Sequence, residues 1–393
     1  MTPEAPSPAR LLKLLCLLWL GGITLRVTIL AVPPVIPLIH ADLHLSETQV
    51  GLLMGLPLAM FAVAALPGSL LVARLGALRT LVVGMAITAL AGCGRGGAFD
   101  VATLYAATLV MGFGIAIMQP ALPALVREWV PHRTVLGSAM ASNGMLVGAT
   151  LASIFTIPLV LPLVGGSWRL DLMVWSAPVL LIAVVFMLGP SGNAPQPVDT
   201  AIGHLWLPDW KRPLTWLLGL TFGSNNSIYF STNAFLPDYL ASQGRADLIG
   251  YGLGWLNGAQ FLATFILMAA AERLTGRTWP YVVFGLMTIA AMLGIIVSTG
   301  VWVVAWAAVV GFATAMTFAL VLALPPRLSA SGDTHRTAAG MFTISYTLAV
   351  IIPTLSGALW DLTGIPWSAF LPLALCAIAL TVLGALLSRQ PGA

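Results

Sequence analysis

Residues 190–212 read PSGNAPQPVDTAIGHLWLPDWKR and form the longest polar interruption in a chain that is otherwise almost continuously apolar. The chain has 393 residues, of which 59% are hydrophobic and 8% are charged. Soluble domains carry about 25% charged residues. A protein of this composition has lipid as its main solvent.

Apolar runs on both sides of this interruption are long enough to cross a bilayer, which takes about 20 mostly apolar residues in a helix. Six runs precede the interruption and six follow it, so we predict an all-α membrane protein with twelve transmembrane helices in two six-helix bundles. The predicted N-terminal bundle covers residues 1–189, the cytoplasmic linker 190–213, and the C-terminal bundle 214–393. The runs are 12–39, 48–73, 78–98, 102–126, 135–163, 168–189, 214–240, 248–271, 279–299, 301–325, 338–360 and 366–388.

The loop cations set the predicted orientation. If both termini are cytoplasmic, thirteen lysines and arginines fall on the cytoplasmic side, and only Arg95, Arg169 and Arg245 fall outside. Cytoplasmic loops carry the excess of positive charge in membrane proteins. We therefore expect a multi-pass protein of the bacterial inner membrane with both ends in the cytoplasm. The cations are scattered singly or in pairs, which does not favour a nucleic-acid partner.

Two similar loops follow the second helix of each predicted half: ARLGALR at 73–79 and ERLTGR at 272–277. Arginines beside a glycine turn can bind the C-terminal ends of neighbouring helices, although the rule that cations face the cytoplasm also explains them. Two related halves are typical of secondary transporters, whose substrate site lies near the midplane between them. The residues that we interpret as gating or hinge residues are Arg74, Arg79, Glu272, Arg273, Arg277 and Arg95. Arg95 lies near the outer surface beside Asp100, and a structural role is the alternative for it.

Arg26 is the only charged residue between Leu14 and Ile39, near the middle of the first run. A cation at that depth costs roughly 2.5–3.5 kcal/mol on insertion scales. All thirteen carboxylates fall in loops or at the ends of predicted helices. The guanidinium fork suits a planar anion or a carboxylate, so we predict that Arg26 binds substrate. The alternative is that it joins helices through backbone carbonyls or amides.

Uncharged polar side chains on other predicted helices could complete a pocket. Asn225 and Tyr229 lie four residues apart, and Asn257 and Gln260 lie three apart, so each pair shares a helix face. Each residue alone could equally form an interhelical hydrogen bond. The predicted substrate-binding residues are Arg26, Gln119, Asn143, Asn225, Tyr229, Asn257, Gln260 and Tyr346.

His40 and His44 flank Asp42 in the first outer loop and suggest a metal site, but we interpret them as solvated loop residues. Ser46 and Gln49 have the spacing of a helix-capping box. The three cysteines are isolated in or beside apolar runs, which favours small buried hydrophobes over a disulfide or metal site. The sequence has no nucleophile–base motif, phosphate loop or Walker motif, so we expect no enzyme, cofactor, metal or ATP-driven pump.

Several of these blocks resemble a known family. The hinge loops resemble the conserved loop of the major facilitator superfamily, with Ala73 in place of the acidic residue that Glu272 keeps. Within that superfamily the chain is similar to the cyanate permease and 2-nitroimidazole transporter family, whose usual Asn-Leu-Arg-Pro of helix 1 is replaced by Thr-Leu-Arg-Val here. The blocks that carry this resemblance are Thr24-Leu25-Arg26, Arg95, Trp168-Arg169, Leu236-Pro237 and Gly357 to Gly364, GALWDLTG.

The resemblance implies a secondary active or facilitative transporter that works by alternating access as a monomer. Together with Arg26 it favours a small anion or a polar planar solute as the substrate, either cyanate-like or a small organic anion. A broad-specificity drug efflux transporter of the same superfamily is the alternative, although the lack of a mid-membrane carboxylate counts against a cation-drug antiporter. A membrane-embedded enzyme or sensor on the same scaffold is a third possibility without a supporting motif.

Overall fold

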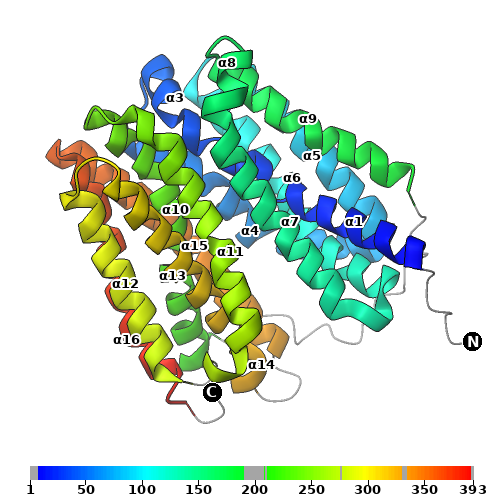
Figure 1. Cartoon of the computed structure of the whole chain (residues 1–393). Helices are drawn as coiled ribbons and strands as arrows, with labels where there is room; N and C mark the ends of the chain where they lie inside the picture. The colour runs from blue at the N-terminus through cyan, green and yellow to red at the C-terminus, as the bar shows by residue number, and fades with distance from the viewer. Residues whose placement is uncertain (1–7, 190–207, 209, 275–276, 330–333, 391–393) are drawn as a thin grey trace, which may run out of the picture. The chain divides into compact units, whose positions relative to one another are not determined.

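The computed structural model describes residues 8–189, 208, 210–274, 277–329 and 334–390. Within them all regular secondary structure is helical (Figure 1). Most of the predicted linker 190–213 lies outside the described residues. The side chain of Glu272 also lies outside them.

The six predicted runs of the N-terminal half are helices, two of them interrupted. The first run consists of α1 (Pro8–Thr24), α2 (Val27–Leu30), a 3-10 turn (Pro33–Val35) and α3 (Ile36–Leu43). The fifth consists of α7 (Thr134–Phe155), a π-helical turn (Thr156–Val160) and α8 (Leu161–Leu163). The other four are α4 (Glu47–Leu75), α5 (Ala77–Gly96), α6 (Val101–Trp129) and α9 (Trp168–Met187).

The C-terminal half also follows the predicted runs. It has six long helices, and one short helix, α14 (Pro325–Leu328), lies between the fourth and the fifth of them. The long helices are α10 (Pro213–Ser242), α11 (Ile249–Leu274), α12 (Thr278–Val297), α13 (Trp302–Leu322), α15 (Thr334–Thr363) and α16 (Leu371–Leu387).

Eleven helical segments among the described residues are long and apolar enough to cross a membrane. The predicted seventh span, α10, is not among them because its centre reads SNNSIYFSTN. Its 30 residues extend about 45 Å at 1.5 Å per residue, which exceeds a hydrocarbon core of about 30 Å. From Thr221 to Leu240 every residue except Tyr229 is buried, so protein rather than lipid surrounds the polar part of this helix.

The described chain groups into two compact units. The first comprises Met1–Val35 and Val63–Val198, and the second comprises Ile36–Ala62 and Asp199–Ala393. Helix α4 therefore contributes its first half to the second unit and its second half to the first. The division into bundles of residues 1–189 and 214–393 stays a prediction.

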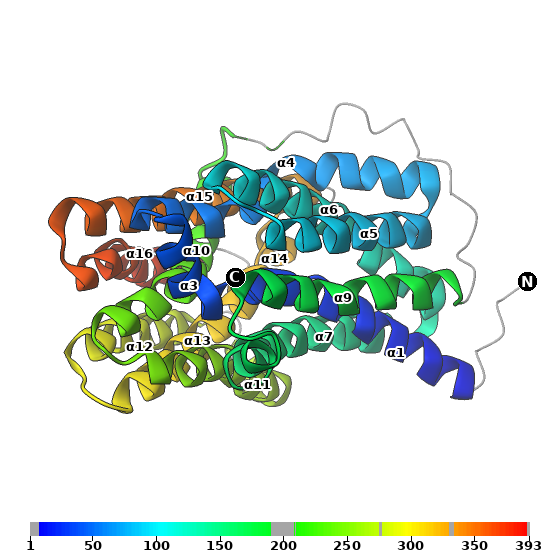
Figure 2. The same ribbon diagram turned by 90° about the horizontal axis from the view of Figure 1, so that it is seen from above.

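In the first unit α5 packs against both α6 and α9, and α1 packs against α7 (Figure 2). Glycines bring α1 and α7 together: a Cβ added to Gly22 would lie 2.0 Å from the Ala141 carbonyl oxygen, and one added to Gly144 would lie 2.0 Å from that of Trp19. Small residues allow this backbone contact between membrane helices. The contact fixes the part of α1 that leads to Arg26.

In the second unit α10 packs against α15 and α16, and α13 packs against α11 and α12 (Figure 1). An aromatic cluster fills its core, where Phe222 contacts Phe318 and Phe342 with ring centroids 5.0 and 5.6 Å apart. The first half of α4 approaches α15 through two glycines. A Cβ on Gly51 would lie 2.2 Å from the Pro353 carbonyl oxygen, and one on Gly357 would lie 2.0 Å from that of Glu47.

Candidate functional site

Arg26 lies at a break in the first membrane segment. α1 ends at Thr24 and α2 begins at Val27. Between them the amides of Leu25 and Arg26 donate to carbonyls three residues back, over 3.1 and 3.2 Å, so the turn is tighter than an α-helix. Thr24, Leu25 and Val27 are buried, whereas Arg26 is only half-buried. The break thus coincides with the one partly exposed residue between Gly21 and Ile36.

The other two candidates of the first unit lie on α6 and α7. The Trp19 indole donates to Asn143 Oδ1 over 2.9 Å, two turns before Arg26 on α1. Asn143 therefore makes the kind of interhelical hydrogen bond that was the alternative interpretation of each polar candidate. Gln119 is half-buried on α6, directly before Pro120.

The α10 and α11 candidates form a hydrogen-bonded network in the second unit. The Tyr229 hydroxyl donates to Asn257 Oδ1 over 2.5 Å, and Gln260 Nε2 donates to the same oxygen over 3.4 Å. Asn257 Nδ2 donates to Asn233 Oδ1 over 3.1 Å. Spacing along the sequence found three of these four residues; Asn233, four positions after Tyr229, extends the same face. Tyr229 and Gln260 are half-buried, so the network has an accessible edge.

Other polar groups of α10 are more deeply buried. Among the described residues, Asn225 Oδ1, Ser227 Oγ and Ser231 Oγ are buried oxygens without a hydrogen-bond partner. Buried polar atoms in native proteins are nearly always hydrogen-bonded, so these three oxygens are places where water or a solute could bind. Tyr346, the α15 candidate, instead stacks on Phe342 with ring centroids 5.9 Å apart and meets Phe61 edge-on at 5.4 Å. That Arg26 shares one cavity with the α10 and α11 residues stays a prediction.

The arginines of the hinge loops lie on exposed helix ends. Arg74 is in the last turn of α4 and Arg79 in the first turns of α5. Between them Gly76 adopts φ 85°, a conformation that favours glycine. Arg273 and Arg277 are likewise exposed. The proposal that these residues hold helix ends together stays a prediction.

Arg95 is buried in the last turn of α5. This side chain is 1% exposed, and its Nη2 donates to the Thr28 carbonyl over 2.8 Å. That carbonyl is available because the Val32 amide bonds to Ile29 instead of Thr28, ahead of Pro33. Arg95 also interacts electrostatically with Asp171, which is buried in the first turn of α9. Arg95 thus supports the segment just after Arg26.

Asp100, which lies near Arg95 in the sequence, caps α6. Its Oδ1 accepts a hydrogen bond from the Thr103 amide over 2.7 Å, and the Asp100 amide donates to Thr103 Oγ1 over 3.3 Å. Hydrogen bonds from the Thr103 side chain and backbone hold the pKa of Asp100 below its ordinary value. A residue at a helix end can serve the cap or a distant partner, and the local cap is the contact that forms here.

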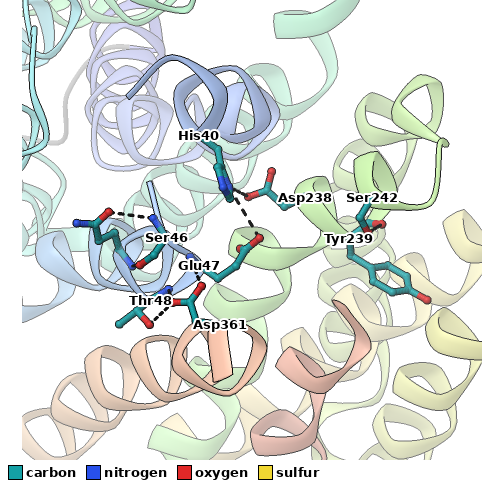
Figure 3. A network of polar contacts seen from close by, with 9 residues as sticks. His40, Ser46, Glu47, Thr48, Asp238, Tyr239, Ser242 and Asp361 are labelled. Atoms are coloured by element: carbon teal, nitrogen blue, oxygen red, sulfur yellow. Dashed lines mark hydrogen bonds and ion pairs between the residues drawn. The ribbon is translucent and has the colours of Figure 1, made fainter. Parts of the chain in front are cut away.

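His40 takes part in a partly buried polar cluster that sequence reasoning missed (Figure 3). It lies in the last turn of α3, with Nδ1 at 3.1 Å from Asp238 Oδ2 and 3.8 Å from Glu47 Oε1. Asp361 accepts hydrogen bonds from the amides of Glu47 and Thr48 over 2.9 and 2.8 Å. The prediction that His40 is a solvated loop residue is therefore wrong.

One signal could have revealed this cluster. Its four members, His40, Glu47, Asp238 and Asp361, each lie near the end of a predicted helix, and the predicted topology places all four ends on the same side. By contrast, His44 is exposed, as expected. The capping box is confirmed, since the Ser46 amide donates to Gln49 Oε1 over 2.9 Å and the Gln49 amide to Ser46 Oγ over 3.2 Å.

Comparison with known proteins identifies the family. The model of the Major Facilitator Superfamily matches residues 18–256, which is more than half of the chain. This chain belongs to the Major Facilitator Superfamily. The resemblance to the cyanate permease and 2-nitroimidazole transporter family is also supported by named relatives. The chain is 27% identical over 379 residues to the 2-nitroimidazole transporter of Escherichia coli, covering 93% of each chain.

A second relative supports the same family resemblance, and a solved structure has the same fold. The chain is 24% identical over 381 residues to the cyanate transport protein CynX of Escherichia coli, covering 94% of this chain and 96% of the relative. A crystal structure of a D-xylose-proton symporter superposes with a TM-score of 0.78 at 13% identity, covering 97% of this chain and 98% of that one, and shows that the fold is shared. The protein is therefore a multi-pass membrane transporter of the superfamily, and not an enzyme, with the all-α twelve-helix fold predicted from the sequence.

Proposed function

We propose that this protein moves a small anion or a polar planar solute across the membrane by alternating access, with Arg26 at the central site. The observation that carries the proposal is the break at residues 25–26, where a half-buried arginine interrupts an otherwise buried segment. Transporters bind substrates near the midplane at such discontinuous helices. The planar fork of Arg26 suits a carboxylate or another flat acceptor.

Two further features support this proposal. The α10 and α11 network offers neutral donors and acceptors, which fit a solute that carries little charge beyond what Arg26 can balance. The relatives are named for 2-nitroimidazole and cyanate, which are a planar heterocycle and a small anion. For this protein, transport of either kind of solute is a proposal.

A binding screen on the purified full chain tests the proposal. Cyanate, small carboxylates and 2-nitroimidazole form the first set of ligands, and lipophilic cationic dyes form the second. We expect a ligand of the first set to raise the unfolding temperature and to exchange across proteoliposomes that contain the protein. Binding of the dyes alone would instead favour broad-specificity efflux.

We also propose that both termini face the cytoplasm of a bacterial inner membrane and that the protein acts as a monomer. The excess of loop cations on the side of the termini supports this orientation. A single cysteine placed between residues 190 and 207 of a cysteine-free variant is expected to resist an impermeant thiol reagent added to intact cells. It should react after the cells are opened. Labelling in intact cells would reverse the orientation.

A further inference from the structure

The side chains of His40, Glu47 and Asp238 form a cluster that has no role in the proposed transport. These residues come from the end of α3, the start of α4 and the last turns of α10, all in the second unit. One ligand atom from each, an imidazole nitrogen and two carboxylate oxygens, lies within 4.8 Å of the others. Figure 3 shows the three side chains pointing toward one another.

We infer that this cluster is a binding site for a divalent transition metal, for which Zn²⁺ is the best match. At metal–ligand bonds of about 2.0–2.2 Å, the ligands of a tetrahedral site lie roughly 3.3–3.6 Å apart. The distances from His40 Nδ1 to Asp238 Oδ2 and to Glu47 Oε1, 3.1 and 3.8 Å, bracket that separation. Small side-chain movements would therefore place all three atoms around one ion.

The burial of Glu47 provides a second argument for a bound cation. Glu47 is 7% exposed, and its Oε2 is a buried oxygen without a hydrogen-bond partner among the described residues. A buried carboxylate needs a counter-charge or hydrogen bonds. With a neutral imidazole, the carboxylates of Glu47 and Asp238 carry two negative charges, which one divalent cation balances.

The donor types narrow the choice of metal. Imidazole suits Zn²⁺ and similar transition metals, whereas Ca²⁺ and Mg²⁺ prefer shells made of oxygen alone. Asp361 is not part of the ligand set, because it already accepts hydrogen bonds from the amides of Glu47 and Thr48. It holds the start of α4, and with it Glu47, in place. A bound ion would join the α3–α4 connection to the end of α10.

The test uses the purified full chain in detergent, without a polyhistidine tag and after treatment with a chelator. We expect Zn²⁺ to raise the unfolding temperature of the parent and Co²⁺ to give the visible absorption of a bound ion. His40→Ala should lose the temperature increase and bind Zn²⁺ roughly tenfold or more weakly. His44→Asn is the matched control, since it removes a nearby exposed imidazole and keeps a residue that tolerates the φ of 50° at this position.

Glu47→Gln is the second variant, because it keeps the size of the side chain and removes one charged ligand. It should weaken Zn²⁺ binding to a similar degree, and it keeps the test decisive if His40→Ala does not fold. Equal Zn²⁺ affinity of the parent, His40→Ala and Glu47→Gln would overturn the proposal. It would also be overturned if Zn²⁺ leaves the parent unchanged while lower pH stabilises it in the presence of chelator, because the cluster would then share a proton instead of a metal.

Discussion

Arg26→Lys is expected to weaken the binding of the solute found by the screen by about tenfold to a hundredfold, although the net charge is unchanged. A bidentate charge-assisted contact contributes about 1.5–3 kcal/mol, and lysine, as a point charge, cannot reproduce the planar fork of arginine. Arg26→Ala removes the charge as well, and loss of a buried charged contact costs about 2–5 kcal/mol of binding free energy. Its affinity should fall more than roughly thirtyfold.

The stability of these two variants separates recognition from a structural role. Removing a cation from the first membrane segment also removes an insertion cost of roughly 2.5–3.5 kcal/mol, so Arg26→Ala should fold. Unfolding temperature and ligand affinity are measured on the same samples, with Arg127→Lys, an exposed position at the end of α6, as the control. If Arg26 mainly joins helices, Arg26→Ala would unfold readily and whatever folds would bind as the parent does.

Arg95→Met is expected to lower the free energy of unfolding by about 1–3 kcal/mol, because it removes the positive charge that acts on the buried carboxyl group of Asp171. Arg95 is 1% exposed and Asp171 is 0% exposed. The substitution also removes the hydrogen bond to the Thr28 carbonyl. Thermal unfolding of the purified protein, together with its yield from membranes, measures the effect.

Two further variants identify the cause of the stability loss expected for Arg95→Met. Arg95→Met combined with Asp171→Leu should recover most of the lost stability, since the second substitution removes the buried carboxyl group that Arg95→Met leaves without a nearby cation. Arg169→Met is the control, because Arg169 is half-buried and its guanidinium lies 4.3 Å from the Trp168 ring; its loss should cost about 1 kcal/mol. A double variant no more stable than Arg95→Met would show that the charge of Asp171 is not what Arg95 offsets.

The sequence by itself determined the helices. A backbone in lipid must satisfy its own hydrogen bonds, so apolar runs of sufficient length have no alternative to the helix. The run at 214–240 also predicts α10, although protein rather than lipid surrounds its polar SNNSIYFSTN centre. Local spacing was equally informative: the capping box of Ser46 and Gln49 and the shared face of Asn257 and Gln260 are both present.

Only the tertiary structure decided the environments of the charged residues near helix ends. In the sequence, Arg95 and His40 resemble the solvated His44, because all three lie near helix ends. In the structure Arg95 is fully buried, whereas His40 is half-buried among carboxylates. Their partners lie far along the chain, with Asp238 198 residues from His40. Hydropathy and spacing describe one helix at a time, whereas the burial of a charge depends on which other helix covers it.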